Sequence, residues 1–366
     1  MNKYKIILFG TGSSSEKIKK IINQERCEIV GYADNNKDKQ GTYIERCYVY
    51  APQQLLQVSF DYIVIGSIYF NEIYEQLIQL QIDAKKIVNI YEYIRYQDVK
   101  LKLKQLDEMQ KPEMMITGMS YARYGFDMDA LTVPAVNVSF NSQDIFYDLC
   151  LAQTVLEKFS TIRYALIGLA YYDFQFDLSL SKEKHLVNRY QIITDMQKKI
   201  DSKKFEQNIL PHYEQQLFEV SDDILSLFIE DFIEKFDHLE QSKVNNRNLD
   251  EQRRELAITH SNKDYPATVQ RNIALMERYF ELLKQHNVTP IIVIHPQEEG
   301  YRKHFDPKMI KEFRAIIEKM AQKYTFEVID LYNDSTFSDD DFYDVHHLNL
   351  QGANKVSKIV NGYIER

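Results

Sequence analysis

Short, continuously apolar runs recur along the chain, and a stretch with helical periodicity follows most of them. Three such runs come before residue 70: YKIILF, EIVGYAD and DYIVIGS. After Pro112 the rhythm restarts with five more: MMITGMS, VPAVNVSF, RYALIGLA, TPIIVIHP and TFEVIDLY. Strands that are apolar on both sides and alternate with helices predict parallel sheets with helices on both faces. The expected fold is therefore α/β, with two doubly wound parallel-sheet domains.

The alternation of strands and helices begins again after Pro112, and this divides the chain into two domains. We expect the N-terminal domain at residues 1–95, a polar helical linker at 96–112 and the second domain at 113–366. A charged stretch at about 181–260 lacks an apolar strand and predicts a helical insertion in the second domain. The 366 residues are enough for each domain to bury its own core.

Charge and composition exclude several classes of protein. The chain has 45 basic and 54 acidic residues, a net charge of −9, and no basic block, which argues against nucleic acid or an anionic membrane as main partner. Cys27, Cys47 and Cys150 are scattered and odd in number, which predicts reduced thiols and no metal site. No run approaches the roughly 18 apolar residues of a membrane span, and the first apolar run is too short for a signal peptide. We expect a cytoplasmic protein.

Polar residues follow the strands of the second domain, at the edge where open parallel sheets bind ligands. These positions hold Ser120, the stretch from Asn137 to Gln143, Tyr171, Tyr172, His295, Asp344 and His347. A serine hydroxyl becomes a good nucleophile when an imidazole takes its proton, and a carboxylate fixes the tautomer of that imidazole. Asp344 and His347 lie three residues apart at a helix entry, so their side chains can hydrogen-bond. Together with Ser120 they predict a triad; taken singly, the serine and the aspartate could each be a helix cap.

Two segments carry a family resemblance. TGMSYARYG and DVHHLNLQGA resemble the first and last blocks of the SGNH (GDSL-like) hydrolases, and the likeness extends over about residues 113–366. In the last block Asp344, His347, Asn349 and Gly352 stand in the matching places, with Leu348 where proline is usual. In character the chain is similar to the D-alanyl transfer protein of teichoic acids. The resemblance implies a flavodoxin-like three-layer fold, with Ser120 as nucleophile and His347 as its base.

The resemblance also points to an oxyanion hole. The family usually supplies a glycine N–H from its second block, but NVSFNSQD has none, so the backbone of Asn141 or Ser142 would donate. The third block usually supplies an asparagine; in LIGLAYYDF the hydroxyl of Tyr171 or Tyr172 would substitute. His295 follows a strand and is either structural or in contact with substrate.

Two other histidines have less definite roles. His346 is interpreted as a neighbour of the base, because the Asp-x-x-His spacing selects His347. The cluster of His260, Lys263 and Tyr265 lies between two predicted helices, and either joins them or forms a lid over substrate.

The first apolar run leads into FGTGSSSEKI. Gly10 and Gly12, followed by Ser13 and Ser14, form a truncated dinucleotide fingerprint, and Asp34 ends the second strand. The pattern resembles Rossmann-like domains of polysaccharide-biosynthesis proteins, which bind nucleotide sugars or nicotinamide dinucleotides such as NAD(P). Backbone N–H groups would hold a phosphate and Asp34 a ribose hydroxyl. The alternative is a domain kept for packing or dimerisation; no Tyr-x-x-x-Lys follows, so an oxidoreductase is disfavoured.

The triad residues favour a serine esterase or O-acyltransferase, and the resemblance implies that it acts on a carbohydrate or a cell-surface polysaccharide or teichoic-acid precursor. The triad itself needs no cofactor. Expected partners are an acylated small molecule, a second copy of the chain or other cell-envelope biosynthesis enzymes. The alternative is a catalytically weak SGNH-like scaffold that binds a nucleotide or nucleotide sugar.

Overall fold

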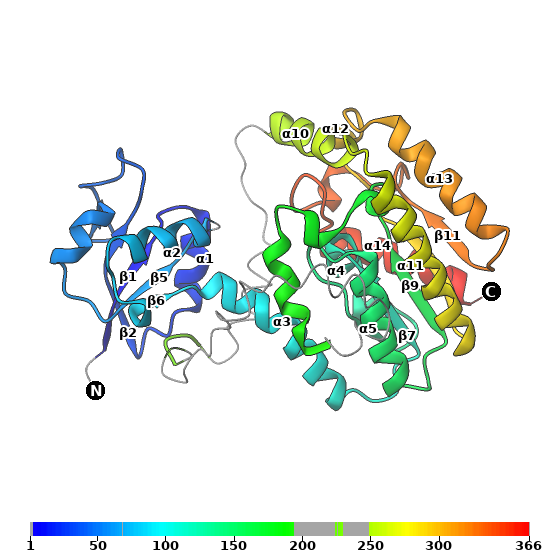
Figure 1. Ribbon diagram of the computed structural model, residues 1–366, viewed down its shortest axis with the longest axis horizontal. Coiled ribbons are helices and arrows are strands. Elements are labelled where there is room, and N and C mark those ends of the chain that lie inside the picture. Colours follow the sequence, from blue (N-terminus) through cyan, green and yellow to red (C-terminus); the bar gives the residue numbers. More distant parts are fainter. Residues whose placement is uncertain (1–2, 68, 194–223, 225, 230–248, 366) are drawn as a thin grey trace. The chain divides into compact units, whose positions relative to one another are not determined.

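The computed structural model describes residues 3–67, 69–193, 224, 226–229 and 249–365 (Figure 1). The chain divides into two compact units. One consists of residues 1–98 with 211–242, and the other of residues 99–210 with 243–366.

The N-terminal unit contains a six-stranded sheet in the order β3-β4-β2-β1-β5-β6. The strands are β1 (Tyr4–Phe9), β2 (Cys27–Ala33), β3 (Tyr43–Ile44), β4 (Cys47–Tyr50), β5 (Tyr62–Ile65) and β6 (Ile87–Val88). Its helices are α1 (Ser13–Ile21), η1 (Pro52–Gln57), α2 (Phe70–Gln79) and η2 (Ala84–Lys86), and α3 (Ile90–Glu108) crosses into the second unit. All neighbouring strands are parallel except β3 and β4. The expectation of a parallel α/β sheet is confirmed, with the strand order reversing beside β1.

A segment of the predicted insertion packs into this N-terminal unit. Leu227 and Phe228 are buried in the same core as the residues of β1. Asn23 donates its backbone N–H to the carbonyl of Leu227 at 2.8 Å. The sequence pattern places the whole insertion in the second domain; these apolar side chains are instead buried against the end of α1, where they remove apolar surface from water.

The C-terminal unit is built on five parallel strands in the order β11-β10-β9-β7-β8. They are β7 (Met114–Gly118), β8 (Ala135–Asn137), β9 (Tyr164–Gly168), β10 (Thr289–Ile294) and β11 (Glu327–Asp330). Numbered along the chain, this is the 2-1-3-4-5 order of flavodoxin-like sheets. Continuous apolar runs predict all five strands, and all five are present.

Helices cover both faces of this sheet. They are α4 (Ser120–Tyr124), η3 (Met128–Ala130), α5 (Ile145–Lys158), η4 (Asp173–Gln175), η5 (Leu178–Leu180), η6 (Lys184–Ile193), α10 (Leu249–Ser261), α11 (Pro266–Gln285), α12 (Glu299–Arg302), α13 (Pro307–Ala321), η8 (Asp339–Asp341) and α14 (Leu350–Ile364). The predicted insertion therefore enters as a 3₁₀ helix, η6, and leaves as α10. The residues between 194 and 248, apart from 224 and 226–229, lie outside the described part of the chain.

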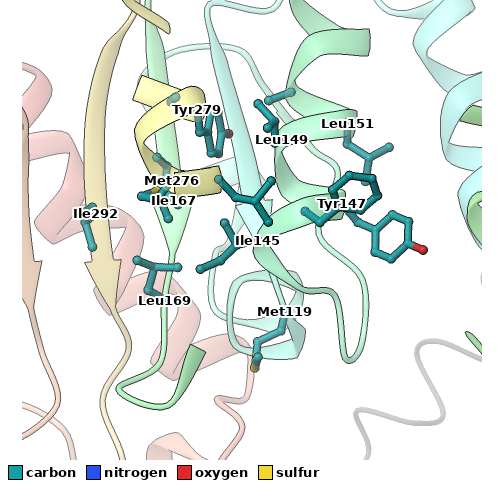
Figure 2. Packing of buried hydrophobic residues seen from close by; sticks show 14 of the residues in the cluster. Met119, Ile145, Tyr147, Leu149, Leu151, Ile167, Leu169, Met276, Tyr279 and Ile292 are labelled. Carbon is teal, nitrogen blue, oxygen red and sulfur yellow. The ribbon is translucent and has the colours of Figure 1, made fainter. Parts of the chain in front are cut away.

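Successive side chains of each strand point to opposite faces of the sheet, which explains why a helical layer forms on each face. Met115 of β7 belongs to the core shared with α5 and α11, whereas Met114 and Ile116 belong to the core shared with α14. Successive side chains of a strand point to opposite faces, so an apolar run of this kind buries both. Figure 2 shows the first of these cores, in which Ile145 and Leu149 of α5 share the interior with Met276 and Tyr279 of α11.

Two composition-based expectations can be compared with the structure. Cys27, Cys47 and Cys150 are free thiols, as predicted. Within the described residues, no helix has the length and apolar character needed to cross a membrane.

Candidate active site

Ser120, His347 and Asp344 form one hydrogen-bonded chain in the C-terminal unit. The Oγ of Ser120 lies 2.8 Å from Nε2 of His347, and Nδ1 of His347 lies 2.8 Å from Oδ2 of Asp344. The serine is separated from the histidine by 227 positions in sequence. An imidazole held between a carboxylate and a hydroxyl can take the hydroxyl proton, so this geometry suits nucleophilic catalysis.

The serine stands at a sharp turn between strand and helix. Ser120 is the first residue of α4, and only Met119 separates it from the end of β7. Gly118 has φ +135°, and a Cβ there would lie only 2.4 Å from the carbonyl oxygen of Gly168. The close approach of β7 to β9 and the backbone angle both require glycine at this position. The turn therefore presents Ser120 at the carboxyl edge of the sheet.

The loop before α14 fixes the other two members. Oδ1 of Asp344 accepts the backbone N–H groups of His346 and His347, at 3.0 and 2.8 Å. The N–H of Tyr343 bonds to the carbonyl of His347 at 3.0 Å, and Asn349 caps α14 through the N–H of Gly352. One carboxylate oxygen thus orders the loop while the other holds the imidazole.

Aromatic rings restrict the His347 imidazole further. The ring of Tyr343 stacks on it with centroids 5.5 Å apart and planes 10° apart, and Tyr124 meets it edge-on at 5.5 Å. The side chain of His347 is only 12% exposed. Its orientation is therefore set by packing as well as by hydrogen bonds.

The charge state of Asp344 follows from its partners. Burial by itself would raise the pKa of this carboxyl, but the charge and hydrogen bond of His347, aided by His346, lower the pKa well below its ordinary value. Asp344 is therefore an anion at working pH, which is the form that orients a neutral imidazole and stabilises an imidazolium.

His346 lies beside the base without joining the chain. Its ring centroid is 3.8 Å from that of His347, and its Nδ1, 3.6 Å from Oδ1 of Asp344, has no hydrogen-bond partner among the described residues. Burial, then the charge of His347, lowers the pKa of His346. Donor atoms of Asp344, His346 and His347 lie within 4.8 Å of one another, so these residues could hold a metal ion. A metal there would occupy the groups that otherwise activate Ser120.

The backbone at Ser142 has the geometry of the missing glycine. Its φ is +57°, in the left-handed region that glycine adopts freely. Its side chain bonds to Glu183 at 2.7 Å, so the hydroxyl points to a surface carboxylate. The N–H of Ser142, like that of Ser120, has no protein partner in the part of the chain that the structure describes. Both N–H groups are available to a developing oxyanion.

Arg189 was not predicted as a site residue, and it fixes the peptide that carries the Ser142 N–H. Its guanidinium donates to the carbonyl oxygen of Asn141. The carbonyl and N–H of a trans peptide point in opposite directions, so holding one directs the other. Arg189 is itself buried, with its guanidinium 5.5 Å from the ring of Phe140. The side chain of Asn141 is used elsewhere, because its amide donates to the hydroxyl of Tyr124 at 3.1 Å.

The tyrosines expected to replace the family's asparagine have other partners. The hydroxyl of Tyr171 donates to Asp330 at 2.7 Å and accepts from Arg314 at 3.1 Å. The hydroxyl of Tyr172 donates to the sulfur of Met119 at 3.3 Å. Tyr171 therefore joins an ion pair at the end of β11, and neither proton is directed at Ser120.

His295 and His260, which lies near the end of α10, are both close to the triad. His295 is 2% exposed, and its ring lies edge-on to Phe126 at 4.9 Å. The ring of His260 lies 6.0 Å from that of His346, and its Nδ1 lies 2.9 Å from the hydroxyl of Tyr301. Burial lowers the pKa of both His260 and His295 to about 3, so both imidazoles are neutral.

Lys263 follows α10 and lies above the ring of Tyr172, with Nζ 5.8 Å from its centroid. Burial lowers the pKa of this lysine, and Asp173 opposes that effect. Tyr265 of the same cluster is exposed, and its backbone N–H bonds to Gln175 at 2.6 Å.

The candidate phosphate loop of the N-terminal unit has glycine-dependent geometry. Gly10 has φ +110°, and Gly12 precedes α1, which begins at Ser13 and Ser14. Oδ2 of Asp34 accepts from Thr11 and Oδ1 from the N–H of Asn36 at 2.8 Å, with Lys39 3.7 Å away. The carboxylate expected to bind ribose is thus already engaged by its own loops.

Comparisons with known proteins add two partial matches. Residues 275–365 match the family model described as DltD protein, and residues 2–88 match the model described as C2185-like, N-terminal. The first match contains Asp344 and His347 but not Ser120. The second is not a Rossmann-like family by its description, so that expectation gains no support. No curated protein matches the chain.

Two solved structures show weaker likeness. One is an inferred acylhydrolase from Bacteroides fragilis, 11% identical, covering 73% of this chain and 96% of that chain, with a TM-score of 0.38. The other is a GDSL-like lipase from Bacteroides thetaiotaomicron, 10% identical, covering 74% of this chain and 98% of that chain, with a TM-score of 0.37. Likeness at this level does not by itself assign a fold or a function.

Proposed function

We propose that the C-terminal unit is a serine-dependent esterase or O-acyltransferase. The observation that carries this proposal is the unbroken hydrogen-bonded chain from Asp344 through His347 to Ser120, with both links at 2.8 Å. Ser120 comes from one segment, and Asp344 and His347 come from another that is far away in sequence. If these residues only capped their own helices, the two segments would not need to meet. The match of residues 275–365 to the DltD model supports the same class of chemistry.

The reaction begins when Oγ of Ser120 attacks the carbonyl carbon of an ester or thioester. Nε2 of His347 takes the hydroxyl proton as the bond forms, and Asp344 stabilises the resulting imidazolium. The N–H groups of Ser120 and Ser142 donate to the oxyanion. His347 then gives its proton to the departing alcohol or thiol, which leaves an acyl-serine. Attack by water or by a second hydroxyl, again assisted by His347, releases the acyl group and restores Ser120.

We propose a carbohydrate or a cell-surface polysaccharide precursor as acceptor. The support is the resemblance to the D-alanyl transfer protein of teichoic acids and the DltD match. In this assignment the N-terminal unit holds or delivers a nucleotide-linked precursor through the loop at Gly12, and this part depends on fold-level analogy.

Covalent labelling tests the activated serine. The full chain is treated with a fluorophosphonate probe, and intact mass and peptide mapping follow. We expect a single adduct on Ser120, absent from Ser120→Ala and from His347→Ala. The matched control is Ser335→Ala, an exposed serine for which no partner is found among the described residues, and it should label like the parent. No adduct in a protein with intact circular dichroism would refute the triad.

A further inference from the structure

A small cavity lies at the carboxyl ends of β9, β10 and β11. Its lining includes Tyr121, Tyr172, His295, Gln297 and Tyr332. The volume of the cavity is about 10 Å³, which corresponds to a group of about the size of one water molecule. The ring of Tyr121 lies 5.6 Å from that of His347, so the cavity lies beside the triad.

Buried polar atoms of the cavity residues lack partners among the described residues. Both ring nitrogens of His295, Oε1 of Gln297 and the hydroxyl of Tyr332 are buried and make no hydrogen bond there. His295 and Gln297 are only 2% and 8% exposed. An unpaired buried polar group is costly, and native proteins pair nearly all of them. Several on residues that line one cavity indicate a position where an ordered water, or a polar group that takes its place, pairs with them.

The chemistry of these atoms restricts that group. A neutral imidazole offers one donor and one acceptor, the amide oxygen accepts, and the phenol does either. None of the residues described as lining the cavity is acidic or basic apart from the neutral His295. A charged group would lose its hydration there without an opposite charge. The cavity therefore suits an uncharged group that both donates and accepts.

We propose that this cavity binds the acyl group carried by Ser120, and that it selects a short acyl chain ending in a hydroxyl over apolar or ammonium-bearing chains of equal size. The inference depends on the proposed acyl-serine chemistry. A hydroxyl two bonds from the ester carbon is small enough for the space. It can donate to Gln297 while it accepts from His295 or Tyr332.

Three phenyl esters of equal heavy-atom count test the proposal: propionate, glycolate and glycinate. The rate of Ser120 acylation is followed by phenol release and intact mass. We expect the glycolyl ester to exceed the propionyl ester by roughly tenfold or more, and the glycinyl ester to be slowest. In Gln297→Leu and Tyr332→Phe the glycolyl preference should fall toward the ratio of the intrinsic reactivities. Tyr324→Phe, on a partly buried tyrosine outside the cavity, is the matched control.

The outcomes distinguish a failure of the cavity assignment from a failure of the serine chemistry. Acylation by all three esters in proportion to their intrinsic reactivity would overturn the cavity's role and leave the serine chemistry standing. Preference for the glycinyl ester would likewise overturn it. Equal loss of all three rates in Gln297→Leu would show a structural role only. Failure of every ester and of the fluorophosphonate probe to modify Ser120 would remove the proposed function and this inference together.

Discussion

The buried carboxyl of Asp148 should make the stability of the fold depend on pH, with a sign and a size that follow from the structure. This carboxyl is 2% exposed on α5, and Nε2 of Gln143 donates to it at 2.6 Å. The N–H of Gly118, two residues before Ser120, also donates to it. Burial raises the pKa of Asp148 from the ordinary 3.8 to about 8. At neutral pH the side chain therefore keeps its proton while it supports the turn that carries the nucleophile.

The raised pKa makes stability depend on pH. The folded state binds the proton more tightly than the unfolded chain, so the stabilisation is complete below the unfolded pKa and is lost as pH rises through the folded one. A pKa difference of one between the two states corresponds to about 1.4 kcal/mol, so the loss between about pH 4 and pH 8 is of the order of 5 kcal/mol at most. We expect Asp148→Asn to remove this slope, whatever its effect on absolute stability.

Urea unfolding followed by circular dichroism at several pH values measures the slope; the chain has no tryptophan, so tyrosine fluorescence is the second probe. The parent should lose up to about 1.4 kcal/mol of unfolding free energy per pH unit within this window, and Asp148→Asn should be flatter by that amount. The matched control, exposed Asp129→Asn, should follow the parent. Parallel curves for Asp148→Asn and the parent would refute a buried protonated carboxyl.

Three further predictions concern backbone geometry and the N-terminal loop. Because the φ of Ser142 is +57°, Ser142→Gly should be more stable than Ser142→Ala by about 1 kcal/mol, although both lose the bond to Glu183; equal stability in thermal melts would contradict the left-handed backbone. Arg189→Met frees the Asn141 carbonyl, so the kcat for acylation should fall by roughly tenfold to a hundredfold with little change in KM, and an unchanged kcat would show that the Ser142 N–H is not used. Since Asp34 is engaged by its own loops, calorimetry should give UDP-glucose and pyrophosphate similar Kd values; a much tighter nucleotide sugar would show that the ribose is recognised after all.

The features that could be predicted from the sequence are those set by residue identity and local period. The strands of the C-terminal unit were visible because strands buried on both faces must be continuously apolar. Ser120, Asp344 and His347 were visible because each follows a strand of one sheet, and topology brings those ends together. Leu227 and Phe228 were not assigned correctly, since an apolar pair in a polar stretch carries no mark of which core receives it.

The donors proposed for the oxyanion hole could not be predicted from the sequence in the same way as the triad. A triad consists of side chains, so its chemistry can be identified from the residue types, whereas an oxyanion hole made of backbone N–H groups depends on dihedral angles. Serine at position 142 gives no sign of a φ of +57°, and Tyr171 gives no sign that Asp330 and Arg314 hold its hydroxyl. The tyrosine was predicted as a donor because a hydroxyl can donate in principle. In the structure this hydroxyl donates its hydrogen bond to Asp330 of β11 instead. Where function depends on backbone N–H groups, the informative residue is the one that anchors the peptide, and here that residue is Arg189.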